Sequence, residues 1–231
     1  MDEEYSWLPF LLQTSDALFP TGAYAHSLGF EESIRLGLVR DEATLLAFAT
    51  NQMLPALRDQ ELPYLRFAHE AAKAHDTGEL CLIDNQISAW KVARETREAS
   101  KQLGTRRMKA LEEINSAAIV QEFAMTLKSG AAAGHHLTVC AVQGVAEGVP
   151  LRASLLAFYY LALSSLCGAA MKLIRIGQSG CQRVLRKAST LAPEVVNASL
   201  LIARENAGWF NPLLEIASMR HERAEERMFI S

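Results

Sequence analysis

The chain has 231 residues, enough for one sizeable hydrophobic core and short for two independent domains. Half of its residues are apolar and 21% are charged, which excludes a disordered or fibrous protein. The formal net charge is −3, from 23 basic and 26 acidic residues. This balance argues against a partner bound by bulk electrostatic attraction, such as nucleic acid or an anionic lipid surface.

Cysteine usage and the first residues indicate the compartment. The four cysteines, at positions 81, 140, 167 and 181, form no Cys-x-x-Cys pair. The stretch from Met1 to Tyr5 is acidic where a secretory signal peptide would be basic. We therefore expect a protein of the reducing cytoplasm.

Residues 64–149 contain no proline and are rich in Ala, Leu, Glu, Lys, Arg and Gln, which favour helices. The natural breaks within this segment are Gly78, Gly104 and the glycines of residues 130–134. The pattern predicts three or four antiparallel helices joined by short connections. A further helix is expected to begin at the end of this glycine stretch, at Gly134 and His135.

Residues 153–171 contain no charged side chain and are long enough to span a membrane. Serine, tyrosine and glycine make the segment only moderately apolar, and no second segment of this kind exists to pair with it. We therefore expect a central buried helix, since a helix that is apolar on all sides belongs at the centre of a bundle. A membrane-associated helical protein is the alternative.

Prolines and glycines bound the later helices. Pro150 and Pro193 are placed like first-turn prolines, and Gly208 is placed like a C-terminal cap, so residues 193–207 are expected to form one helix. Strand and hairpin signals are nearly absent. The prediction is an all-α, single-domain, multi-helix bundle over residues 1–231, with a central buried helix.

Motifs for nucleotide or ester hydrolysis are missing: the sequence has no phosphate loop, no Gly-x-Gly-x-x-Gly after a strand and no Gly-x-Ser-x-Gly elbow. Near the N-terminus, Asp16, His26 and Glu31 are the best acid/base or ligand candidates. Polar residues in a turn before a helix are more often caps and satisfied hydrogen-bonding groups. A small helical metalloenzyme remains an alternative on these residues.

A second metal candidate combines His135, His136 and Cys140, because His136 and Cys140 share a helix face. A third and a fourth ligand cannot be identified, and a small buried cysteine is common in cores. We therefore predict neither a metal site nor a cofactor.

Residues 89–109 are locally basic, which would suit a nucleic-acid surface. Aromatic residues for base stacking are missing from the segment. Lys91 with Glu95 and Arg94 with Glu98 lie at i,i+4 spacing and can pair along a helix. A solvated helix face is the preferred interpretation.

Residues 218–231 depart from an ordinary chain end, because a charged stretch is followed by Met228-Phe229-Ile230-Ser231. Such a tail can fold onto a partner, with Phe229 in a pocket and Arg227 against a carboxylate. A tail docked on its own domain is the alternative. The predicted partner-binding residues are Arg220, His221, Glu222, Arg227, Met228, Phe229, Ile230 and Ser231.

Four strings, spread over essentially the whole chain in one order, resemble the UreF family of urease accessory proteins. They are residues 11–31, 94–100, 172–178 with Gln182 and Arg183, and 217–222 with 227–231. The positions that carry the resemblance include Asp16, Pro20, Gly22, His26, Ser27, Glu31, Arg94, Glu95, Arg97, Glu98, Lys172, Gly177, Gln178 and Arg183.

This resemblance implies an all-helical scaffold, commonly a dimer, with no reaction of its own. Members of the family join the accessory protein UreD (also called UreH) and the GTPase UreG. The assembly docks on apo-urease, so that nickel enters in a step coupled to GTP hydrolysis. The resemblance thus implies a cytoplasmic protein-binding chaperone that regulates a GTPase, with neither nucleic acid nor membrane as a partner.

Overall fold

A computed structural model describes residues 5–16, 18–21, 29–222 and 228–229, and within these ranges the chain contains helices and no strand. The all-α prediction is confirmed. The chain divides into two compact units that interleave in sequence. Unit 1 comprises Met1–Thr21, Tyr64–Trp90 and Ser100–Phe158, and unit 2 comprises Gly22–Pro63, Lys91–Ala99 and Tyr159–Ser231. That residues 1–231 form one domain stays a prediction.

Unit 1 is built from helices that pack around a core of large apolar side chains. In it α6 packs on α8 and α9, and these two helices pack on each other. Ile83, Phe123 and Val139, one from each of these helices, are fully buried. Its helices are α1 (Leu8–Ser15), most of α5 (Leu62–Lys73), α6 (Thr77–Trp90), most of α7 (Arg94–Ile114), α8 (Ala118–Ser129), α9 (His136–Ala146) and the first turns of α10 (Leu151–Leu173).

Five helices, not three or four, occupy the proline-free segment, because breaks at residues 91–93 and 115–117 are marked by no glycine, and two of the expected breaks were misplaced. Gly78 lies in the first turn of α6, and Gly104 lies inside α7. A Cβ atom at residue 104 would collide with the carbonyl oxygen of Gly134. Gly104 therefore permits close backbone packing and does not end a helix. The break at residues 130–134 is confirmed, and α9 begins at His136.

Side chains, and not glycine or proline, stabilise the break between α6 and α7. The Arg97 guanidinium donates hydrogen bonds to the carbonyl oxygens of Lys91 and Val92, at 2.8 and 3.2 Å. The carboxylate of Glu215 accepts the N–H of Ala93 at 3.1 Å. Backbone groups that leave the helical ladder thereby keep partners.

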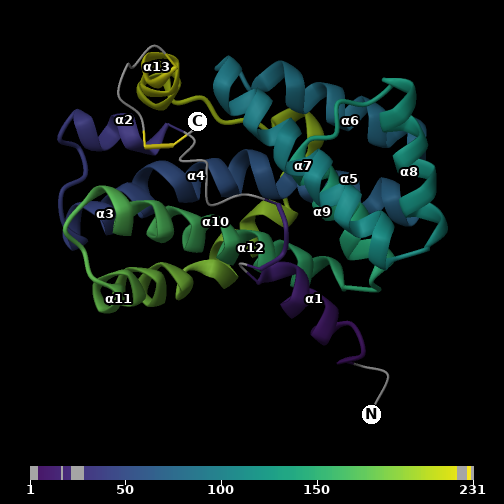
Figure 1. Ribbon diagram of the computed structural model, residues 1–231, viewed down its shortest axis with the longest axis horizontal. Coiled ribbons are helices and arrows are strands. Elements are labelled where there is room, and N and C mark those ends of the chain that lie inside the picture. The colour runs from purple at the N-terminus through teal and green to yellow at the C-terminus, as the bar shows by residue number, and fades with distance from the viewer. Residues whose placement is uncertain (1–4, 17, 22–28, 223–227, 230–231) are drawn as a thin grey trace. The chain divides into compact units, whose positions relative to one another are not determined.

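Unit 2 pairs several of its helices: α13 packs on α2, as Figure 1 shows, α11 packs on α3, and α12 packs on η4. The elements are α2 (Phe30–Arg35), α3 (Glu42–Phe48), η3 (Ala49–Met53), α4 (Leu54–Ala56), η4 (Leu57–Glu61), α11 (Gln178–Ser189), α12 (Ala192–Leu200), η5 (Arg204–Asn206), α13 (Pro212–His221) and the last turns of α10.

Pro193 lies in the first turn of α12 as predicted, but the helix ends at Leu200 and does not reach residue 207. The chain then turns through η5, and the N–H of Gly208 donates to the carbonyl oxygen of Asp59 at 2.9 Å. A tertiary hydrogen bond thus takes the place of the predicted helix cap. Pro150 directly precedes α10 instead of lying inside its first turn.

Among the described residues, α10 is the one helix long and apolar enough to cross a membrane, a test that core helices of soluble proteins also pass. Leu155, Tyr159 and Leu163 are almost completely buried, whereas Leu156 and Tyr160 are 41% and 47% exposed. The helix therefore contributes to the core along one side, and not on all sides as its composition suggested.

Candidate partner-binding site

The candidate site begins with two well-defined helix starts in unit 2. Asn211 caps α13 by accepting the N–H groups of Leu213 and Leu214, and Pro212 occupies the first turn. Gly29 precedes α2 with a φ of 86°, and a Cβ atom there would collide with the Ser218 side chain. A glycine at this turn therefore lets α13 approach α2 closely.

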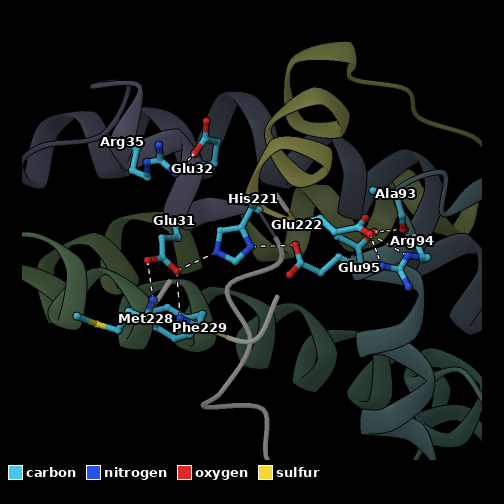
Figure 2. Close-up of polar contacts among 12 residues, drawn as sticks. Glu31, Glu32, Arg35, Ala93, Arg94, Glu95, His221, Glu222, Met228 and Phe229 are labelled. Atoms are coloured by element: carbon cyan, nitrogen blue, oxygen red, sulfur yellow. Dashed lines mark hydrogen bonds and ion pairs between the residues drawn. The ribbon is translucent and has the colours of Figure 1, made fainter. Parts of the chain in front are cut away.

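His221, in the last turn of α13, is completely buried and bridges two carboxylates (Figure 2). Its Nε2 lies 2.9 Å from Glu31 of α2, and its Nδ1 lies 2.9 Å from Glu95 of α7. Only an imidazolium can donate from both nitrogens, so the geometry fits a positively charged ring between two negative groups. We call Glu31, His221 and Glu95 the clamp.

Glu31 also binds the backbone of the C-terminal segment (Figure 2). Its two carboxylate oxygens accept the N–H of Met228 at 2.9 Å and the N–H of Phe229 at 3.1 Å. Burial alone would raise the pKa of Glu31, but the hydrogen bonds from Met228, His221 and Phe229 outweigh burial and leave the pKa below its ordinary value. The folded state therefore favours the charged carboxylate.

Beyond residue 222 the structure describes two tail residues, Met228 and Phe229, and their side chains differ in exposure. Phe229 is buried, and the ammonium nitrogen of Lys172 lies 5.0 Å from the centre of its ring. Met228 is 62% exposed. The described part of the tail is thus docked on its own chain, which was the alternative, and the partner-binding role of these residues stays a prediction.

Charged side chains surround the clamp. Arg94 donates to the carboxylate of Glu222 at 2.8 Å from its Nε, and the guanidiniums of Arg35 and Arg220 lie 3.2 and 3.6 Å from Glu32. Glu32 itself is buried. The arginine side chains are more than half exposed, so these pairs contribute little stability and remain accessible to another protein.

The described site residues predicted from the sequence lie in both units. Unit 2 brings together Glu31, Arg94, Glu95, Lys172, His221, Glu222 and Phe229 around the C-terminal segment. Asp16 and Pro20 belong to unit 1, where Asp16 accepts the N–H of Leu18 at 2.8 Å as the expected turn cap. The predicted residues outside the described ranges are Gly22, His26, Ser27, Arg227, Ile230 and Ser231.

The remaining family-motif residues have local structural partners. Arg97 supports the break before α7, and a carboxylate oxygen of Glu98 lies 4.0 Å from the Nε atom of Arg97. Gly177 is the N-cap of α11, Gln178 begins that helix, and Arg183 forms an ion pair with Glu42 of α3 at 2.6 Å.

The histidine and cysteine candidates for a metal site make other contacts. His135 is fully buried, with one ring nitrogen 2.7 Å from the Ser88 hydroxyl and the other 3.0 Å from that of Ser100. His136 lies 3.5 Å from the sulfur of Cys140, and burial raises the pKa of that thiol. Over the described ranges, no three His, Cys, Asp or Glu side chains gather in a way that could hold a metal ion.

The basic segment of residues 89–109 is only in part the solvated face that was expected: Arg94, Arg106 and Lys109 are exposed, but other members are bound or buried. Glu95 is bound to the buried His221, and Arg107 is 5% exposed. Arg107 donates to the carbonyl oxygen of Thr14 at 3.1 Å and lies 5.0 Å from the ring centre of Phe19. Arg107 therefore lies in the protein interior and is unavailable to a nucleic acid.

Asp84 is an important residue that the sequence analysis missed. Its fully buried carboxylate accepts the N–H groups of Ala133, Gly134 and His135 at 2.6, 2.9 and 2.8 Å, and so fixes the connection before α9. A signal was present, because Asp84 shares the apolar face of α6 with Leu80. A charged residue on such a face indicates a buried anchor.

Comparison with known proteins decides the family. Residues 39–189 match the UreF family. The urease accessory protein UreF of Paenarthrobacter aurescens (strain TC1) is 38% identical over 226 residues, covering 96% of each chain. The chain belongs to the UreF family. UreF of Bacillus sp. (strain TB-90) is 29% identical over 221 residues, covering 96% of this chain and 97% of that protein. UreF proteins are accessory proteins of urease and not catalytic enzymes, as the sequence analysis expected.

Proposed function

We propose that this UreF-family chain is a cytoplasmic scaffold that joins UreD (UreH) and the GTPase UreG on apo-urease. In this role it regulates the GTP-dependent entry of nickel and performs no chemistry itself. The observation that carries the proposal is that Glu31 binds the backbone N–H groups of Met228 and Phe229 while the Met228 side chain remains exposed.

The clamp prepares this segment for binding. Two hydrogen bonds to Glu31 and the burial of Phe229 order the backbone of Met228 and Phe229 before any partner arrives. A preordered segment loses less conformational entropy on association than a flexible one. The exposed Met228 side chain offers an apolar contact to a partner. We propose that UreD binds at the exposed Met228 side chain, which we call the proposed partner face.

The effect on the GTPase follows from differential affinity. A homodimer would present two equivalent surfaces and could hold two UreG molecules together. If these surfaces bind the GTP-bound form of UreG more tightly, they shift its population toward that form. The family resemblance supports the dimer and the two partners, and the helical architecture supplies rigid elements on which such surfaces can be built.

The test is a single substitution that places a charge on the proposed face. Met228→Glu should reduce co-purification of co-expressed UreD by at least about tenfold, because a carboxylate must then be desolvated at the interface. Met125→Glu is the matched control: Met125 is 63% exposed on α8 in unit 1. Both variants should keep the helical circular dichroism of the parent protein. Equal recovery of UreD with the two variants would refute the proposal.

Deletion of the tail is a poorer test. Removing residues 220–231 would also remove His221, whose ring is fully buried between two carboxylates. Loss of UreD after such a deletion could therefore reflect a damaged fold, which the substitution at the exposed Met228 avoids.

A further inference from the structure

Two cysteines from neighbouring helices of unit 2 face each other. Cys167 lies in the last turns of α10 and Cys181 in the first turn of α11, 14 positions apart in sequence. The sulfur of Cys167 lies 3.7 Å from the carbonyl oxygen of Cys181, and the sulfur of Cys181 lies 3.4 Å from the carbonyl oxygen of Cys167. These reciprocal contacts place both side chains across the same short gap between the helices.

Neither cysteine has a role in the clamp or in the proposed partner face. Both are free thiols, with exposed fractions of 5% and 4%. A tight metal site would need further ligands, and over the described residues no third His, Cys, Asp or Glu joins them in a group that could hold a metal. The chemistry left to two facing thiols is their joint oxidation.

We propose that Cys167 and Cys181 form a reversible disulfide that links α10 to α11 when a small peroxide reaches them. In the first step a Cys181 thiolate attacks one oxygen of hydrogen peroxide, which gives a sulfenic acid and hydroxide. The Cys167 sulfur then attacks the sulfenic sulfur and expels its oxygen as water. Overall, two thiols lose two electrons and two protons, and one peroxide becomes two waters.

Hydrogen bonding between the thiols sets the order of these steps. Burial, together with the neighbouring Cys181, raises the pKa of Cys167 to about 12. Burial also raises the pKa of Cys181, but the hydrogen bond from Cys167 opposes that effect. Cys181 is therefore the first nucleophile and Cys167 the resolving thiol. Their burial also explains why a small oxidant is required and why bulky disulfides such as oxidised glutathione should react poorly.

A link at this position would have a structural consequence. The connection between Cys167 and Cys181 contains Lys172, whose ammonium lies over the Phe229 ring, and Arg183 just beyond it pairs with Glu42 of α3. Oxidation would join α10, which carries Lys172 at the Phe229 ring, to α11. The inference concerns thiol chemistry alone and stands or falls independently of UreD binding.

The experiment uses the full-length chain with Cys81→Ala and Cys140→Ala, which leaves the pair as the sole thiols. After mild hydrogen peroxide, the count of alkylatable thiols should fall from two to zero, the intact mass should fall by two hydrogens, and dithiothreitol should reverse both changes. Adding Cys167→Ala should let dimedone trap a sulfenic acid at Cys181, whereas Cys181→Ala should leave Cys167 largely unmodified.

The wild-type chain provides the second measurement in case the double variant folds poorly. Peptide mapping after peroxide treatment should show a Cys167 to Cys181 cross-link within one chain. Oxidation of Cys81 while both buried thiols stay reduced would overturn the proposal. So would sulfinic acid at Cys181 without a cross-link, a disulfide between two chains, or protection of the pair by a bound soft metal ion.

Discussion

Glu31 and His221 are 190 positions apart in the chain, and their side chains meet at 2.9 Å in the interior of unit 2. This contact ties the first helix of the unit to its last helix. Because Glu31 also binds the backbone of Met228 and Phe229, the same carboxylate anchors the C-terminal segment. The Glu31 carboxylate therefore supports both the packing of unit 2 and the position of Met228.

Replacement of His221 by alanine should destabilise unit 2 by about 3 kcal/mol, because two carboxylates would then be buried without their shared cation. Urea unfolding followed by circular dichroism measures the loss. His75→Ala is the control: His75 also pairs with a glutamate, Glu122, but its side chain is 50% exposed, and we expect a loss of about 0.5 kcal/mol or less. Equal losses in the two variants would contradict the account of the clamp.

Acid should weaken the contribution of Glu31. Its pKa is lower in the folded state than its ordinary value of 4.5, so its charge stabilises the fold above that value. The contribution is lost as the pH falls below 4.5 and through the folded pKa. We therefore expect Glu31→Gln to lower the melting temperature at neutral pH, and the difference from wild type to shrink as the pH falls below 4.5. A difference that stays constant across this range would count against the charged hydrogen bonds.

Two glycines inside helices should respond to alanine in opposite directions. Gly104→Ala should destabilise the chain by about 2 kcal/mol or more, since the new Cβ would collide with the backbone of Gly134 and His135. Gly168→Ala should stabilise it by about 0.5 to 1 kcal/mol, because a Cβ there meets no atom within 4 Å and alanine favours the helix. Thermal unfolding of both variants tests the close approach at Gly104, which a stabilised G104A variant would disprove.

Asp84→Ala should cost about 3 kcal/mol, because three backbone N–H groups would lose a buried charged acceptor. Asp76→Ala removes an exposed helix cap that accepts the N–H of Glu79, and should cost about 1 kcal/mol. Hydrogen exchange at residues 133–135 should rise in the first variant and stay unchanged in the second. Retained protection at these amides in D84A would show that Asp84 is not their anchor.

Local signals in the sequence were sufficient for the fold class and for several boundaries. The glycines at residues 130–134 and Pro193 mark a break and a helix start that the structure confirms. Gly104 and Gly208 misled the prediction, because their roles depend on Gly134 and Asp59, which are distant in sequence. Local spacing cannot reveal such tertiary contacts.

The candidate site followed the same rule. Glu31, Glu95 and His221 were each singled out by the family resemblance, but nothing in their spacing indicated that one histidine would bridge the two carboxylates. For Arg94 and Glu95, helical periodicity suggested pairs within the same helix. In the structure they bind Glu222 and His221, at the C-terminal end of α13. The docked position of Phe229 likewise depends on Lys172 and the clamp, which only the folded chain brings together.

The central claim is that this chain supports nickel entry into urease by binding other proteins. The most direct measurement is the nickel content and activity of urease from cells that lack the chain and are complemented with wild type, M228E or M125E. The account predicts nickel-loaded, active urease with wild type and M125E, and nickel-poor, inactive urease with M228E at equal expression. Full nickel loading with M228E, or in cells without the chain, would contradict it.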